Sequence, residues 1–177
     1  YEPTADTYAV AWFEHGAEPV VAGCSYTLLP RCTPEALQAF ASRMASPDEA
    51  PVVILQRDSR AHVARDRPSR TTGYLAFAAG PLAAPGRLRE VNRPCAVMVR
   101  DTDDGLRISV ASTDLDDWPV WAGGKIGISG DIVLTLAGRW TVAAGDVRAD
   151  RRGDTTAVTV PFRTFLPVVL GLAPTGP

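Results

Sequence analysis

The sequence predicts a mainly β protein: an antiparallel multi-sheet β-sandwich with one short helix, followed by a smaller C-terminal two-sheet sandwich. Three observations predict this class. Apolar residues alternate with other residues over many short stretches, as in half-buried strands. Gly and Pro contribute 15 residues each to a chain of 177 and are spread at positions typical of turns. Only one segment shows a helical period.

The expected strands follow one another through short, turn-rich connections. In one clear example, Leu106, Ile108 and Val110 point to one side and the residues between them to the other, which is typical of an antiparallel strand with one buried face. The expected strands are Thr7–His15, Gly23–Leu29, Val52–Gln56, Ala61–Arg65, Thr71–Ala78, Cys95–Arg100, Leu106–Ser112, Asp131–Ala137, Arg139–Val147 and Thr155–Arg163.

A helix is expected between the second and third of these strands. Thr33 is a favourable N-cap, Pro34 suits the first helical position, and Glu35 complements the positive end of the helix dipole. Ser46-Pro47 ends the segment. Apolar residues recur with helical spacing at Leu37, Phe40, Ala41 and Met44.

The density of Gly and Pro changes between the strands at Thr71–Ala78 and Cys95–Arg100. Two Gly and two Pro fall within seven residues there, beginning at Gly80. We therefore expect three regions: 1–80 as the last strands of a large central β-sandwich domain, 81–93 as a linker, and 94–177 as a small C-terminal β-sandwich domain. The chain enters a strand-like run soon after Tyr1, without a signal-like segment, so we expect it to be the C-terminal piece of a longer polypeptide.

Composition excludes several function classes. With 18 Lys and Arg against 20 Asp and Glu, the net charge is −2, which removes the electrostatic basis for binding nucleic acid. The longest apolar run, near Val168–Ala173, is far shorter than the roughly 18 residues needed to span a bilayer. We expect neither nucleic-acid nor membrane partners.

The residues that could carry catalysis or bind a cofactor form no recognisable site. The two histidines, His15 and His62, both lie in expected strands and are interpreted as structural. Gly123-Gly124, Lys125 and Gly127 match neither standard nucleotide-binding fingerprint. We therefore expect no catalytic residue and no cofactor in this chain.

Aspartates gather in two places, which raises the alternative of a calcium site. Asp103-Asp104-Gly105 lies between two alternating apolar runs, however, and is the usual signal of a hairpin turn. We favour the turn and expect no metal. The two groups are Asp101, Asp103 and Asp104, and Asp114, Asp116 and Asp117.

The three cysteines have no metal-like spacing. Cys24 and Cys32 are close enough in sequence for a local disulfide. The favoured interpretation is that all three, with Cys95, are isolated buried thiols.

Two of the four tryptophans could bind carbohydrate. Trp118 and Trp121 flank Pro119-Val120 in an expected loop, where aromatic rings could stack on sugars. The competing interpretation is that they cover the end of the sandwich as hydrophobic plugs. Trp12 and Trp140 lie in expected strands and are predicted to belong to the core.

The order of features resembles the C-terminal β region of polysaccharide lyase family eight, the hyaluronate, chondroitin AC and xanthan lyases. In that family a strand ends in His-Gly, a hairpin returns through a Tyr-containing strand ending in Pro, and a short helix follows. The corresponding segments here are Ala11–Gly16, Ser25–Pro30, the helix carrying Phe40-Ala41, the strand Val52–Gln56, and then Pro94–Arg100 and Leu106–Asp114.

The sequence departs from the family pattern at two positions. His62-Val63-Ala64 stands where the family often has Gln-Ala-Val, and Ser112-Thr113-Asp114 stands where it often has Asp-Pro-Thr. The resemblance implies a secreted lyase that cleaves acidic, uronic-acid-containing polysaccharides by β-elimination. Its catalytic Asn, His, Tyr and Arg would lie in an N-terminal helical portion, which becomes the expected partner. No segment of this chain matches that catalytic motif.

Two hypotheses about function follow. In the first, the chain is the non-catalytic β scaffold of such a lyase and is inactive alone. In the second, it is an independent carbohydrate-binding β-sandwich module that uses Trp118 and Trp121. Five arginines, Arg57, Arg60, Arg65, Arg67 and Arg70, could attract a polyanionic glycan, although Asp58 and Asp66 lie among them.

Overall fold

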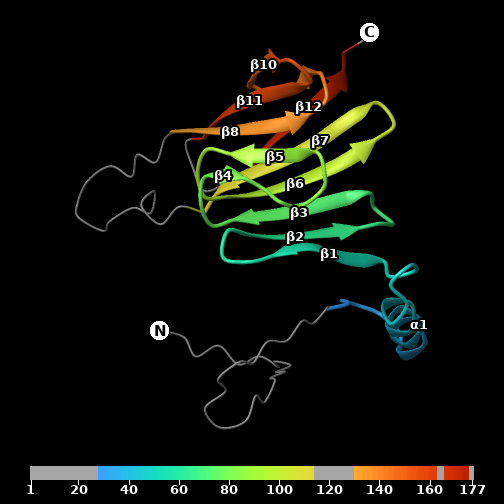
Figure 1. Cartoon of the computed structure of the whole chain (residues 1–177). Coiled ribbons are helices and arrows are strands. Elements are labelled where there is room, and N and C mark those ends of the chain that lie inside the picture. The colour runs from blue at the N-terminus through green and yellow to red at the C-terminus, as the bar shows by residue number, and fades with distance from the viewer. Residues whose placement is uncertain (1–27, 114–129, 163–165, 176–177) are drawn as a thin grey trace, which may run out of the picture.

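A computed structural model describes residues 28–113, 130–162 and 166–175. Within these ranges the chain has one helix and twelve strands (Figure 1). No helix among the described residues is long and apolar enough to cross a lipid bilayer. The elements are α1 (Pro34–Met44), β1 (Val52–Arg57), β2 (Ala61–Asp66), β3 (Thr71–Ala76), β4 (Gly80–Pro81), β5 (Leu88–Val91), β6 (Cys95–Thr102), β7 (Gly105–Ser112), β8 (Gly130–Ala137), β9 (Trp140–Ala144), β10 (Arg148–Arg152), β11 (Thr155–Phe162) and β12 (Val168–Pro174).

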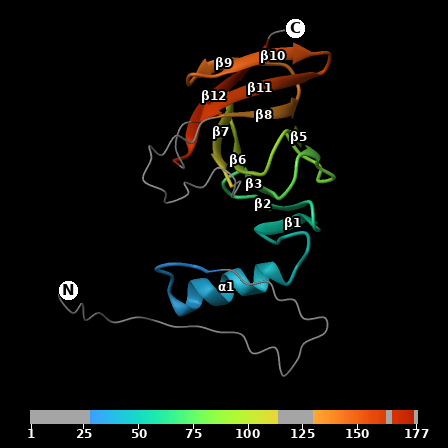
Figure 2. The same ribbon diagram turned by 90° about the vertical axis from the view of Figure 1, so that its left-hand side faces the viewer.

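The strands form two antiparallel sheets. The larger has seven strands in the order β1-β2-β3-β6-β7-β12-β9, and the smaller has five in the order β10-β11-β8-β5-β4. Figure 2 shows the two sheets stacked, with α1 set apart beyond the edge strand β1. The predicted mainly β, antiparallel sandwich with one short helix is confirmed.

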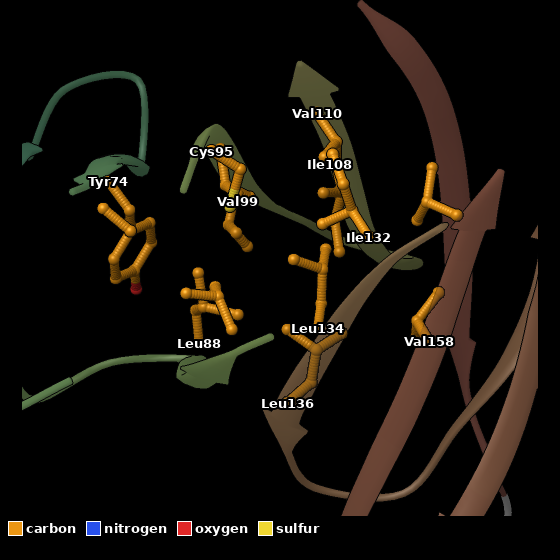
Figure 3. Close-up of a cluster of buried hydrophobic side chains, with 14 of the residues drawn as sticks. Tyr74, Leu88, Cys95, Val99, Ile108, Val110, Ile132, Leu134, Leu136 and Val158 are labelled. Carbon is orange, nitrogen blue, oxygen red and sulfur yellow. The ribbon is translucent and has the colours of Figure 1, made fainter. Parts of the chain in front are cut away.

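One apolar core fills the space between the sheets. Ile108 and Val110 of the larger sheet face Ile132 and Leu134 of the smaller sheet (Figure 3), and all four are almost completely buried. The alternation read from the sequence creates this core, since every second residue of each strand faces the other sheet. The apolar residues of β7 are therefore in contact with those of β8.

The domain division expected from the sequence is wrong for the described residues. β3 lies before the proposed linker and β6 after it, yet the two strands pair directly from Thr71↔Arg100 to Ala76↔Cys95. Residues 81–93 are not a linker, because β5 pairs with β8 and both Leu88 and Val91 are buried in the core. The described strands form one sandwich with one core.

The expected helix is confirmed, but its apolar stripe is not buried by any residue that the structure describes. The Thr33 hydroxyl accepts a hydrogen bond from the Ala36 amide at 3.2 Å, as an N-cap should. α1 begins at Pro34 and ends at Met44, as predicted, and none of its residues is buried. The capping residues and the helical spacing therefore identified the helix, but they did not show what the helix packs against.

Four strands, β4, β5, β10 and β12, were not predicted, and the first two predicted strands lie wholly or mostly outside the described residues. β5 falls in the Gly- and Pro-rich segment, while β10 is short and charged. β12 ends in Pro174, which is tolerated because it is the last residue of the strand. The predicted strand Thr7–His15 and most of Gly23–Leu29 lie outside the described ranges.

We predict that Gly105→Ala destabilises the protein strongly. Gly105 has φ +147°, and a Cβ there would overlap the backbone oxygen of Leu172 on β12. The free energy of unfolding should fall by about 2 kcal/mol or more, measured by urea denaturation. The matched control is Gly73→Ala, since a Cβ on Gly73 has no atom within 4 Å. Equal stability of the two variants would contradict the packing of β7 against β12.

Candidate functional site

His62 lies in an apolar setting on the outer face of the larger sheet. It is exposed on β2 and pairs across the strands with Leu75. Its ring makes an edge-on contact with Phe77, with centroids 5.0 Å apart and an interplanar angle of 86°. An apolar ring cannot orient an imidazole for proton transfer, so this contact does not build an acid–base pair. His15 lies outside the described residues.

The first aspartate group forms a turn and ion pairs. β6 ends at Thr102 and β7 begins at Gly105, so Asp103-Asp104 is a two-residue hairpin loop, and the predicted turn is confirmed. Asp101 pairs with Arg65 at 3.4 Å and with Arg87 at 2.8 Å. The structure shows no group of three metal-ligating side chains among the residues it describes. Asp114, Asp116 and Asp117 lie outside these ranges.

The arginines suggested for glycan attraction are engaged within the chain. Arg65 pairs with Asp101, and Arg70 pairs with Asp103 at 2.7 Å. Arg60 donates to the Ala79 carbonyl at 2.8 Å, and Arg67 donates to the Asp48 carbonyl at 2.5 Å. The Arg65–Asp101 pair links β2 to β6, and the other three contacts hold the turns at the ends of the strands. They leave less cationic character for a polyanion than the sequence alone indicates.

The tryptophans fall into two groups. Trp140 belongs to the core, as predicted: its indole Nε1 donates to the Ala137 carbonyl at 2.7 Å, and the Arg87 guanidinium lies 5.5 Å from its ring centroid. Trp118, Trp121 and the glycines around Lys125 lie in the segment 114–129, outside the described residues. Trp12 also lies outside the described residues, near the start of the chain. The segment 114–129 connects β7 of the larger sheet to β8 of the smaller sheet.

The described cysteines have opposite environments. Cys95 is buried in the core, and burial raises the pKa of its thiol to about 12. Cys32 is free and exposed, so the expectation of a buried thiol is wrong there. Cys24 lies outside the described residues.

A groove that the sequence analysis did not identify lies on the outer face of the larger sheet. Its volume is about 540 Å³ and its exposed surface is mainly apolar. We call it the outer groove, lined chiefly by Ile54, His62, Gly73, Leu75, Ala96 and Met98. The sequence carried only a weak signal for it: Ile54, Leu75 and Met98 are apolar at outward positions, where a solvated face usually carries polar residues.

The geometry defines the class of the molecule first: an antiparallel β-sandwich whose described residues show no assembled catalytic centre. Comparison with known proteins then shows what the chain is similar to. Residues 53–113 match the family model described as polysaccharide lyase family 8, C-terminal beta-sandwich domain. The chain is thus related to the C-terminal region of polysaccharide lyase family 8, and the resemblance found in the sequence is confirmed.

Individual relatives agree with this assignment. Chondroitin sulfate ABC endolyase of Proteus vulgaris is 26% identical over 175 residues, which are 98% of this chain and 17% of the endolyase. Xanthan lyase of Paenibacillus shares the fold with a TM-score of 0.61 at 22% identity, covering 84% of this chain and 13% of that protein. Chondroitin AC lyase of Streptomyces coelicolor A3, solved with chondroitin sulphate, has a TM-score of 0.59 at 15% identity, covering 78% and 17%.

We predict that the two described thiols differ sharply in reactivity. At pH 8 the Cys95 thiol should stay protonated and unmodified by iodoacetamide in the native protein, because its raised pKa and its burial both suppress the reactive thiolate. Cys32 should react at the rate of an exposed thiol. Peptide mass spectrometry before and after denaturation measures both. Rapid native labelling of Cys95 would contradict the described core.

Proposed function

We propose that this chain is the non-catalytic β scaffold of a secreted polysaccharide lyase. The larger enzyme cleaves uronic-acid-containing glycans of the hyaluronan or chondroitin type by β-elimination, and its catalytic portion lies outside this chain. The observation that carries the proposal is the match of almost the whole chain to only 17% of a chondroitin lyase. A chain that matches only 17% of the length of that lyase is more consistent with a part of an enzyme than with a complete enzyme.

The chemistry of β-elimination explains what a catalytic portion must supply. A cationic or hydrogen-bonding group neutralises the uronate carboxylate, which lowers the pKa of the proton on C5. A base removes that proton, the C4–O bond breaks as the C4–C5 double bond forms, and an acid protonates the leaving oxygen. His62, placed against Phe77, is poorly arranged for either proton transfer. Four arginines suggested for glycan attraction, Arg60, Arg65, Arg67 and Arg70, bind groups of their own chain.

The β portion would contribute rigidity and one wall of the cleft. Two sheets locked by a continuous core provide a fixed surface against which the catalytic portion is held. Arg65 and Arg67 contribute at most weak attraction for the glycan, because both are already bonded at the edge of the sheet. A scaffold of this kind affects turnover by holding other residues in place, without touching the reacting atoms.

We predict that replacing the histidines leaves the chemistry of the larger lyase intact. His62→Gln and His15→Gln should each change kcat less than twofold or so and leave the pH profile unmoved, because neither is a base in the reaction. The assay is the ultraviolet absorbance of the unsaturated uronate product. Arg65→Gln with Arg67→Gln serves as the comparison and should lower activity by no more than a few fold, through substrate affinity. A loss of several orders of magnitude with either histidine variant would place catalysis in this chain.

The second candidate function is carbohydrate binding through Trp118 and Trp121. Its support is their position in the sequence, on a connection between the two sheets. If these rings bind sugar, Trp118→Ala with Trp121→Ala should weaken the binding of chondroitin or hyaluronan oligosaccharides to the chain at least tenfold or so. Trp140 is unsuitable as a target because it is buried. Unchanged affinity in calorimetry would exclude the two tryptophans and leave them as hydrophobic plugs.

A further inference from the structure

The outer face of the larger sheet carries an apolar row that crosses most of its strands. The pairing register places six outward residues side by side, from the edge strand β1 to β12. Ile54 and Met98 are 56% and 57% exposed, and Val169 is also largely exposed. The row consists of Ile54, Ala64, Gly73, Met98, Ser109 and Val169.

A second row beside the first completes the outer groove. His62 pairs with Leu75, Leu75 with Ala96, and Ala96 with Ala111. The floor of the groove is made of small residues, and a Cβ on Gly73 has no atom within 4 Å. Leu75 and Met98 also line the groove and are 37% and 57% exposed, so they are accessible to an incoming apolar side chain.

The outer face of the smaller sheet has a different character. There the register places Arg148 beside Thr159, and Asp150, Ala157, Thr135 and Glu90 in one row. Charged and hydroxyl side chains suit a face that stays in water. The contrast is not complete, since Ala157 is only 2% exposed and the larger sheet also carries the outward arginines Arg100 and Arg107. The two outer faces differ in their exposed large apolar residues: the larger sheet carries Ile54, Met98 and Val169, a surface of the kind that marks contact with protein, and the described strands of the smaller sheet carry none.

The apolar surface extends to β1, the strand that lies nearest to α1 (Figures 1 and 2). β1 is the edge strand of the larger sheet, and both views place α1 beyond it (Figures 1 and 2). Leu37 and Met44 on the apolar stripe of α1 are exposed as well. An exposed apolar edge strand is a pairing and aggregation hazard unless something covers it. The uncovered apolar groups of the outer face and of α1 thus lie on neighbouring elements.

We propose that the outer groove and its two rows dock the part of the polysaccharide lyase that lies outside this chain. This inference rests on the proposed function and adds the surface through which the scaffold would act. The occupant is favoured over a second copy of the chain because the chondroitin lyase relative extends far beyond the matched 17% of its length. The partner surface is apolar and fills the hollow at Gly73.

Met98 is a natural probe of this contact. The chain has two methionines, and Met98 stands in the middle of the apolar row. Peroxide converts an accessible methionine to its sulfoxide, and burial slows the reaction. The experiment compares the oxidation rate of Met98, followed by peptide mass spectrometry, in the chain 1–177 and in the full-length lyase polypeptide. Docking should slow the oxidation on the order of tenfold.

A matched control sits on the opposite face. Thr159→Met introduces a methionine at an outward position of β11, and it should oxidise at the same rate in the chain and in the full-length polypeptide. Within the full-length polypeptide alone, Met98 should also oxidise more slowly than the methionine introduced by Thr159→Met. This second comparison holds even if the chain folds poorly by itself.

The outcomes separate docking from the proposed function. Equal oxidation of Met98 in the two contexts overturns the docking surface, even if the polypeptide forms unsaturated product. Protection of Met98 without any lyase activity supports docking and refutes the proposed function. Protection that already appears in the chain alone and grows with its concentration, with a dimer in sedimentation velocity, assigns the groove to a second copy and overturns the inference.

Discussion

The pairing of β3 with β6 is the contact on which the rest of the structure depends. It joins β1–β3 to β6, β7, β12 and β9 in one seven-stranded sheet. The segment between β3 and β6 contributes β4 and β5 to the smaller sheet. Without this ladder the two segments would each expose an open edge and half of a core. Because the ladder also sets the register, it decides that Gly73 lies beside Met98 and thereby shapes the outer groove.

Local pattern predicted the strands well and their partners poorly. Alternation identified β1, β2, β3, β6, β7, β8, β9 and β11 to within a few residues, because a half-buried strand must present apolar side chains on every second position. The domain boundary was wrong because Gly and Pro show where a chain turns, not whether it leaves the fold. The buried Leu88 and Val91 sit between such turns. β12 was missed because its apolar run is continuous, without the alternation of apolar and polar residues that identified the other strands, and because it ends in Pro174.

The surroundings of the candidate residues were predicted only in part. The turn at Asp103-Asp104 was predicted, but the contacts of His62 with Phe77 and of Asp101 with two arginines join residues far apart in the sequence and were not. The outer groove was not predictable, because its residues come from β1, β2, β3 and β6 and become neighbours only through strand register. A surface built from non-local pairing leaves only a weak trace in a single sequence, here apolar residues at outward positions such as Leu75 and Met98.

Native-state hydrogen exchange tests the central claim that one core supports one scaffold. Under increasing urea, amides of β2 and β3 should exchange through the same global opening as amides of β8 and β11, because the two sheets share their apolar core. Their exchange free energies should then converge. If residues 52–76 instead exchange through a separate, lower-energy opening while β8 and β11 remain protected, the chain contains two independent units and the account is contradicted.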